Sequence, residues 1–217
     1  PNNIEAVEAL AEAFYKKENF DRSITEYRHL LELDPKYLPA YIQLGWVHYR
    51  KEEFRMAIAW TRRGLKLGIK SPQLTTLASM NLGLYSWLNG DYSSAKKWYR
   101  DSLKERSSII LQGILNDLKE TALLFPKHIE KDFFTGWIYM EAGEKDKALP
   151  YLSRFLTLAP DGELADEART LIDQKLSPKF TEKPVAPNGD PSLSGEPSKE
   201  MVFIPSGFSI MGSNDSR

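Results

Sequence analysis

The feature that most constrains this chain is a pair of small residues, twelve positions apart, that occurs four times. The pairs are Ala11 and Ser23, Gly45 and Ala57, Gly83 and Ala95, and Gly136 and Ala148. Helical periodicity places the first member of each pair in one predicted helix and the second member in the next. A glycine inside a helix costs about 1 kcal/mol relative to alanine, so its repeated use calls for a packing reason. Close contact between two antiparallel helices is such a reason, and the pattern predicts a series of helix pairs.

The spacing between these pairs indicates a structural repeat. Their first members follow one another at intervals of 34, 38 and 53 residues. A helix-turn-helix unit of about 34 residues is the tetratricopeptide spacing. The chain resembles the tetratricopeptide repeat family at Val7, Leu10, Ala11, Phe14, Ser23, Tyr27 and Pro35, at Tyr41, Leu44, Gly45 and Ala57, at Leu82, Gly83, Ala95 and Tyr99, and at Gly136, Tyr139, Ala148 and Pro160.

This resemblance implies an all-α fold, a right-handed superhelical solenoid of antiparallel helix pairs. The expected repeats are 4–37, 38–71, 76–106 and 129–162. The inward residues of the first helix are expected to be Val7, Leu10, Ala11 and Phe14.

The long interval before the last repeat has the length of one more helix. We expect an extra helix at 107–125, and the second half of a degenerate repeat is the alternative. Its apolar face is predicted to hold Leu111, Leu115, Leu118, Ala122 and Phe125. Residues 163–176 are expected to form a C-terminal capping helix, because the last repeat would otherwise leave an apolar face in water.

The composition changes after the capping helix. Residues 177–199 are rich in proline, glycine and serine, which is typical of a linker. Residues 200–217 resemble the start of a formylglycine-generating-enzyme (sulfatase-modifying factor) domain at Met201, Val202, Ile204, Pro205, Gly207, Phe208, Met211, Gly212 and Ser213, with Ser206 in place of a glycine. The catalytic and metal-binding residues of that family would lie downstream, so none is assigned. A chain that begins at Pro1 and stops at Arg217 is expected to be a piece of a longer protein.

Composition excludes several classes of function. The chain holds 29 Lys and Arg against 30 Asp and Glu, which is not the basic excess of a nucleic-acid-binding protein. It has no cysteine, and no apolar run is long enough to insert into a membrane. His29, His48 and His128 lack metal-ligand spacing. We therefore expect no metal, no cofactor and no catalytic site in these residues, and the absence of cysteine leaves a cytoplasmic and a cell-envelope location both open.

The family resemblance implies a concave groove lined by residues of the first helix of each pair. Carried over to this sequence, the groove-lining residues, and so the expected partner-binding residues, are Glu8, Glu12, Ile42, Trp46, Tyr49, Met80, Leu84, Trp87, Phe133, Trp137 and Met140. The lysines, arginines and asparagines of a carboxylate clamp are absent from several matched positions. An amphipathic helix, or an apolar peptide with basic flanks, fits the groove better.

The alternative is that Trp46, Trp87 and Trp137 are buried between repeats or covered by the helix at 107–125, and that the glutamates are an ordinary solvated face.

The resulting hypothesis is a scaffold that binds a protein or peptide partner in its groove. Two alternatives stay open. The chain could position substrates for a larger enzyme of the formylglycine-generating type, or it could assemble with further copies of itself into a homo-oligomer.

Overall fold

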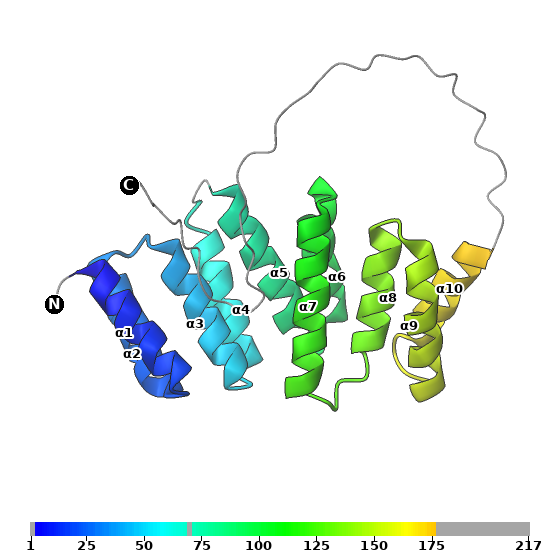
Figure 1. Cartoon of the computed structure of the whole chain (residues 1–217), viewed down its shortest axis with the longest axis horizontal. Helices are drawn as coiled ribbons and strands as arrows, with labels where there is room; N and C mark the ends of the chain where they lie inside the picture. The colour runs from blue at the N-terminus through cyan, green and yellow to red at the C-terminus, as the bar shows by residue number, and fades with distance from the viewer. Residues whose placement is uncertain (1–2, 69–70, 177–217) are drawn as a thin grey trace, which may run out of the picture. The chain divides into compact units, whose positions relative to one another are not determined.

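The computed structural model describes residues 3–68 and 71–176. Within these ranges the secondary structure is entirely helical, with ten α-helices, one short 3-10 helix and no strand. The described residues divide into two compact units, one ending at His128 and the other beginning at Ile129. Figure 1 labels the helices of both units. The all-α prediction is therefore confirmed. The expected linker at 177–199 and the expected second domain at 200–217 lie outside the described residues.

The first unit contains three helix pairs followed by a helix that has no pairing partner. The pairs are α1 (Ile4–Lys16) with α2 (Phe20–Leu33), α3 (Leu38–Arg50) with α4 (Phe54–Leu65), and α5 (Pro72–Leu88) with α6 (Tyr92–Ser102). The short helix η1 (Leu103–Glu105) follows α6, and α7 (Ser108–Leu124) packs against α5. Adjacent pairs contact one another in chain order, α2 against α3 and α4 against α5.

The second unit contains one helix pair and a third helix that packs on it. The pair is α8 (Lys131–Glu141) with α9 (Lys145–Leu158), and α10 (Ala165–Leu176) contacts both of its members. Leu164 and Ala168 are buried there. Helix α10 therefore occupies the position expected of a capping helix within this unit.

The repeated glycines allow the two helices of a pair to approach closely. A Cβ added at Gly45 would lie 2.2 Å from Thr61 Oγ1 and 3.1 Å from the carbonyl oxygen of Ala57. A Cβ at Gly136 would lie 2.6 Å from Leu152 Cγ, again with a backbone carbonyl of the second helix at 3.1 Å. Any larger residue would force the helices apart. The packing reason inferred from the small-residue pairs is confirmed.

The turn inside each pair uses the same unusual backbone conformation. Glu18, Glu52, Gly90 and Gly143 have positive φ, and each lies seven residues after the first small residue of its pair. Glycine adopts this left-handed conformation without steric cost, whereas an L-residue is strained there. The first two turns therefore carry strain that the later two avoid.

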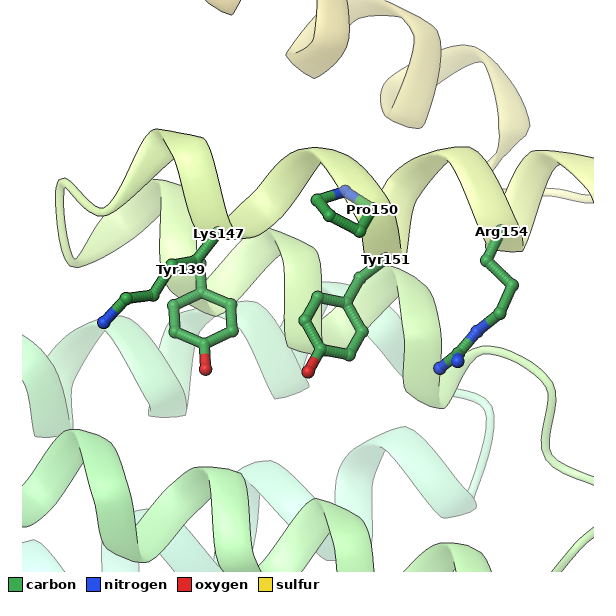
Figure 2. Close-up of a pocket in the computed structure, with 5 residues that line it drawn as sticks. All are labelled: Tyr139, Lys147, Pro150, Tyr151 and Arg154. Atoms are coloured by element: carbon green, nitrogen blue, oxygen red, sulfur yellow. The ribbon is translucent and has the colours of Figure 1, made fainter.

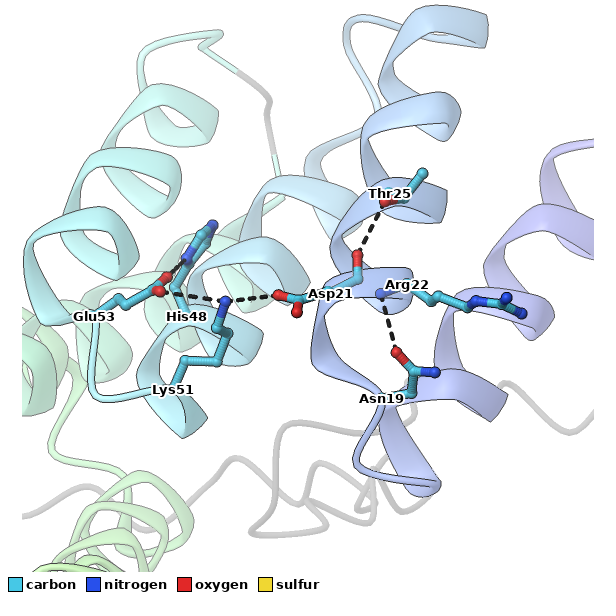
Figure 3. Close-up of polar contacts among 7 residues, drawn as sticks. All are labelled: Asn19, Asp21, Arg22, Thr25, His48, Lys51 and Glu53. Atoms are coloured by element: carbon cyan, nitrogen blue, oxygen red, sulfur yellow. Dashed lines mark hydrogen bonds and ion pairs between the residues drawn. The ribbon is translucent and has the colours of Figure 1, made fainter.

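A polar network connects the first two pairs at these turns (Figure 3). Lys51 Nζ lies 2.7 Å from Asp21 Oδ1 and 3.2 Å from Glu53 Oε1, and His48 Nδ1 lies 2.6 Å from Glu53 Oε2. Asn19 caps α2 by accepting from the backbone N–H of Arg22. Burial lowers the pKa of His48, although the Glu53 carboxylate acts in the opposite direction. The histidine Nε2 is buried and has no hydrogen-bond partner among the described residues, so a second proton would be poorly accommodated.

Two predicted helix faces were wrong in detail. Leu10 is 43% exposed, whereas Leu44 and Leu82 at the equivalent positions are fully buried. No described helix pair precedes α1, whereas α3 and α5 each pack against the second helix of the preceding pair. The buried residues of α7 are Ile110, Ile114, Leu118 and Thr121, so its packed face is rotated by about one residue from the predicted one.

Among the described residues, no helix is long and apolar enough to cross a membrane.

Candidate functional site

Most of the expected groove residues are buried inside the chain. The buried residues are Ile42, Trp46, Tyr49, Met80, Leu84, Trp87, Phe133 and Trp137, with exposed fractions of 6% or less. Glu8, Glu12 and Met140 are half-exposed. The expectation that Trp46, Trp87 and Trp137 line an open groove was therefore wrong, and all three are buried as in the alternative. Of the expected groove residues, the first unit contains Glu8, Glu12, Ile42, Trp46, Tyr49, Met80, Leu84 and Trp87, and the second unit contains Phe133, Trp137 and Met140.

In the first unit, α7 covers the face formed by the first helices of the second and third pairs. The Tyr49 hydroxyl lies 2.8 Å from Thr121 Oγ1, and the ring of Phe125 meets that of Tyr49 edge-on at 5.4 Å. Gly113 faces the Met80 ε-methyl so closely that an added Cβ would lie 3.0 Å from it. The sequence analysis left open whether the helix at 107–125 covers the tryptophan-bearing face. In the structure it does so over α3 and α5.

Trp46 is held by polar contacts to the preceding pair. Its Nε1 donates to the Tyr15 hydroxyl at 2.8 Å, and Arg50 Nη1 donates to the same oxygen at 3.0 Å. The Arg50 guanidinium also lies over the rings of Tyr15 and Phe20. Trp46 therefore ties α3 to α1, which explains why it is not presented to solvent.

The docking face of α7 includes a carboxyl group. Asp117 is half-buried on α7, and burial raises its pKa well above its ordinary range, with the nearby Glu120 acting in the same direction. The Asp117 charge in turn contributes, after burial, to the raised pKa values of Tyr85 and Tyr99. The interface between α7 and the pairs is therefore sensitive to the protonation of one acid.

The half-exposed part of the first-helix face lies on α1 and is acidic. Glu8 accepts a hydrogen bond from the Tyr37 hydroxyl at 2.8 Å. Burial raises the pKa of Glu8, the Tyr37 hydrogen bond opposes this, and the negative charges of Glu12 and Glu5 raise it further. Glu5 is exposed, and Glu12 lies 3.8 Å from Lys16. This region can receive a lysine or arginine side chain.

A shallow pocket of about 470 Å³ lies in the second unit, between side chains of α8 and α9 (Figure 2). Tyr139, Lys147, Pro150, Tyr151 and Arg154 line it. The two tyrosine rings are 5.7 Å apart, and in Figure 2 their hydroxyls point the same way. Lys147 lies over Tyr139 at 5.9 Å, and Arg154 lies over Tyr151 at 5.5 Å.

Both cations of this pocket are paired with acids of the same unit. Arg154 Nε donates to the buried Asp132 at 2.6 Å, and Lys147 pairs with Glu144. Because both cations are paired with acids, the groups of the pocket that can contact a ligand are mainly the faces of the two tyrosine rings. Sequence reasoning missed it, although Tyr139 and Tyr151 repeat the twelve-residue offset three positions after Gly136 and Ala148.

Within residues 3–68 and 71–176, no group of three or more His, Asp or Glu side chains is placed to hold a metal ion.

Comparison with protein-family models identifies the repeats. Residues 8–74 match a model described as tetratricopeptide repeat, and residues 134–161 match a second model of the same description. These segments are tetratricopeptide repeats, as their spacing and buried glycines predicted. Neither match reaches residues 200–217, and the resemblance of that segment to a formylglycine-generating enzyme receives no support.

Stress-induced-phosphoprotein 1 of Caenorhabditis elegans is a curated relative. It is 20% identical over 177 residues, which cover 77% of this chain and 55% of that protein. The chain thus spans about half the length of the curated relative it matches.

Three solved structures of similar proteins also align with this chain. YrrB, titled a TPR protein with an unusual peptide-binding site, is 19% identical and aligns over 78% of this chain and 93% of its own, with a TM-score of 0.44. MamA is 20% identical and aligns over 81% of this chain and 82% of its own, with a TM-score of 0.46. BtubC from P. vanneervenii is 16% identical over 91% and 87%, with a TM-score of 0.48.

Proposed function

We propose that this chain is a protein-interaction scaffold that holds an amphipathic helical segment of a partner against the first-helix face of its helix pairs. The observation that carries the proposal is the docking of α7. This helix has no pairing partner, and it packs on α3 and α5 through Thr121, Phe125 and Gly113. A face that receives one amphipathic helix of the chain has the shape and apolar character to receive another.

The chemistry of the partner follows from the part of this face that α7 leaves half-exposed. On α1 that part presents Glu5, Glu8 and Glu12. Repeat proteins use extended surfaces of stacked repeats for binding. The lysine or arginine flanks of a partner segment suit the acidic residues of α1, and its apolar stripe reaches the rest of the face only by displacing α7. In this proposal Trp46, Trp87 and Trp137 act indirectly. They are buried beneath the surface residues and support the position of the first helices.

In the second unit, the first-helix face is represented by α8. Phe133 and Trp137 are buried there and Met140 is half-exposed. A methionine adapts readily to different apolar partners. We propose Met140 as a binding residue of the second unit taken by itself. No observation favours a substrate-positioning or self-assembly role over this scaffold role.

A displayed library of random peptides of about 18 residues tests the proposal, since a helix of that length covers about five turns. The expected result is enrichment of amphipathic sequences that carry Lys or Arg next to the apolar stripe. Reversal of two charges, Glu5→Lys with Glu12→Lys, should abolish that enrichment. Glu8 is left unchanged because it holds Tyr37.

A matched control changes the same charge elsewhere. Glu32 and Glu163 are exposed and lie off this face, on α2 and before α10. The variant Glu32→Lys with Glu163→Lys should enrich the same peptides as the unaltered chain. Equal enrichment by the Glu5 and Glu12 variant, or enriched peptides without basic residues, would count against the proposed surface.

A further inference from the structure

A second surface, on the second helices of the first two pairs, gathers two arginines around one indole. The guanidinium carbon of Arg28 on α2 lies 5.5 Å from the centre of the Trp60 ring on α4, and that of Arg63 lies 5.6 Å from it. Arg63 also lies 5.8 Å from the ring of Tyr41, and the rings of Tyr41 and Trp60 are 6.1 Å apart. Aromatic faces therefore fix the position of both guanidinium groups.

Neither of these guanidinium groups is neutralised within the described residues. Arg28 and Arg63 are exposed, and neither makes an ion pair or hydrogen bond to a described residue. Glu32 lies one helical turn after Arg28 on α2 but is not paired with it. Arg50 and Arg154, which also stack on tyrosine rings, are both paired with carboxylates. Arg28 and Arg63 thus differ from Arg50 and Arg154 in lacking a carboxylate partner, and from Arg22, which stacks on Phe14, in sharing one ring.

Stacking uses the face of a guanidinium and leaves its N–H donors at the edge available for an oxyanion. Two such groups also repel each other unless an anion lies close to both. The exposed Arg62 on α4 and Lys66, the residue that follows the helix, add positive charge near Arg63 in the sequence. The missing component of this surface is a negatively charged group.

We propose that Arg28, Trp60 and Arg63 form a binding site for an acidic segment of a partner protein. The two guanidinium carbons are at most about 11 Å apart, the sum of their distances to the indole centre. Carboxylates on one face of an extended peptide recur about every 7 Å, and those one helical turn apart are about 5–6 Å from each other. Two aspartates or glutamates of one short segment can therefore reach both arginines.

A local site of this kind fits an acidic peptide better than a nucleic acid. A nucleic-acid surface follows the phosphate backbone with a broad basic stripe. Here the chain has a net charge of −1, and the two arginines of the proposed site lie around a single indole. The site lies on α2 and α4, so it is separate from the first-helix face and does not depend on the function proposed for it.

Fluorescence anisotropy of the whole chain with a labelled peptide tests this site. The probe is a nonapeptide with four glutamates and aspartates between glycines and serines. We expect saturable one-to-one binding that weakens about tenfold or more when Arg28→Gln and Arg63→Gln are combined, because charge-assisted hydrogen bonds are lost. The control Arg55→Gln with Lys97→Gln removes the same charge from exposed positions of α4 and α6 and should weaken binding less than about threefold.

Three further measurements distinguish a specific site from nonspecific attraction, from a nucleic-acid site and from loss of folding. The variant Arg28→Lys with Arg63→Lys retains the charge and removes the planar fork, so it should bind more weakly than the unaltered chain. Unchanged binding by the lysine variant, or an equal loss in both glutamine variants, would show nonspecific attraction and overturn the site. A charge-matched oligothymidine that competes as well as the peptide would overturn the assignment to a protein partner. Matching thermal unfolding curves show that the variants are folded.

Discussion

Helix α7 and the helix pairs of the first unit are held by different kinds of contact. Each pair is fixed by small residues within about one repeat of each other, such as Gly45 against Ala57 and Thr61. Helix α7 instead depends on contacts between residues distant in sequence, Tyr49 with Thr121 and Met80 with Gly113. Within a pair, the two helix backbones are too close to accept a larger side chain. Helix α7 instead contacts the ends of side chains, such as the ε-methyl of Met80 and the hydroxyl of Tyr49. We infer that the pairs form a rigid frame and that α7 occupies a binding face of that frame.

The largest expected effect breaks a pair. Gly45→Val places atoms within 2.2 Å of Thr61 Oγ1 and 3.1 Å of a backbone carbonyl, and overpacking of this kind costs about 3 kcal/mol. The free energy of unfolding in urea, followed by far-UV circular dichroism, measures the loss.

The matched change on α7 is Gly113→Ala, where the new Cβ meets only the flexible end of Met80. The gain in helix propensity of about 1 kcal/mol offsets that crowding, so stability should stay the same or rise slightly. Equal destabilisation by the two substitutions would remove the distinction between frame and docked helix.

The second prediction loosens α7 and leaves the frame intact. Thr121→Val removes a hydrogen-bond partner and leaves the Tyr49 hydroxyl buried, at a cost of about 1–2 kcal/mol. Hydrogen exchange should show faster opening of α7 with unchanged protection in α1 and α2. Adding Tyr49→Phe should restore part of the loss, because both partners are then apolar. Faster exchange spread over all helices would contradict a separately docked α7.

The third prediction concerns pH, and the two regions should respond in opposite directions. The raised pKa of Asp117 means that its contribution to α7 docking is full below its ordinary pKa of 3.8 and is lost as the pH rises through the raised value. The pKa of His48 is lowered by burial. Its contribution to the stability of the paired region is therefore complete above pH 6.5, its ordinary pKa, and is lost as the pH falls through the lowered pKa. Acidification from pH 7 should therefore strengthen α7 docking and weaken the α3–α4 turn.

Protection factors from hydrogen exchange, corrected for intrinsic rates, report each region separately. Asp117→Asn should raise α7 protection at pH 7 and remove its pH dependence. His48→Gln should reduce the pH dependence of the α3–α4 turn only. Parallel pH responses of the two regions in the unaltered chain would show that these groups do not act as assigned.

The smallest expected effect lies in the turns of the pairs. Glu52 is exposed and has a φ of 60°, so Glu52→Gly relieves left-handed strain of about 1–2 kcal/mol, and the larger backbone freedom of glycine offsets part of it. A net stabilisation of roughly 0.5 kcal/mol is expected. Gly90→Ala, at the equivalent position of the third pair, should destabilise by about 1 kcal/mol. Urea midpoints that shift in the same direction for both would contradict a common turn geometry.

Local contacts explain why the pairs were predictable from the sequence. The twelve-residue offset couples positions that meet within one helix-turn-helix unit, and every member of the four small-residue pairs is buried. The exposure of Leu10 was missed because burial at that position depends on a neighbouring helix, which the residues of α1 do not encode.

The packing of α7 was harder to predict because the helix is apolar on several sides. Ile109, Ile110, Leu111, Ile114 and Leu115 support more than one face, and the sequence favoured a face rotated from the observed one. The same long-range contacts decide the exposure of the tryptophans. The spacing places Trp46 and Trp87 on the first-helix face, but only the docking of α7 and the partnership of Trp46 with Tyr15 show that they are buried.

The most direct test of the account is hydrogen exchange of the whole chain with and without a library-selected amphipathic basic peptide. The account predicts new protection in the first helices α1 and α3, a change in the exchange of α7, and little change in α2, α4 and α6. Protection confined to the second helices, or no protection in the presence of a bound peptide, would contradict a binding site on the first-helix face.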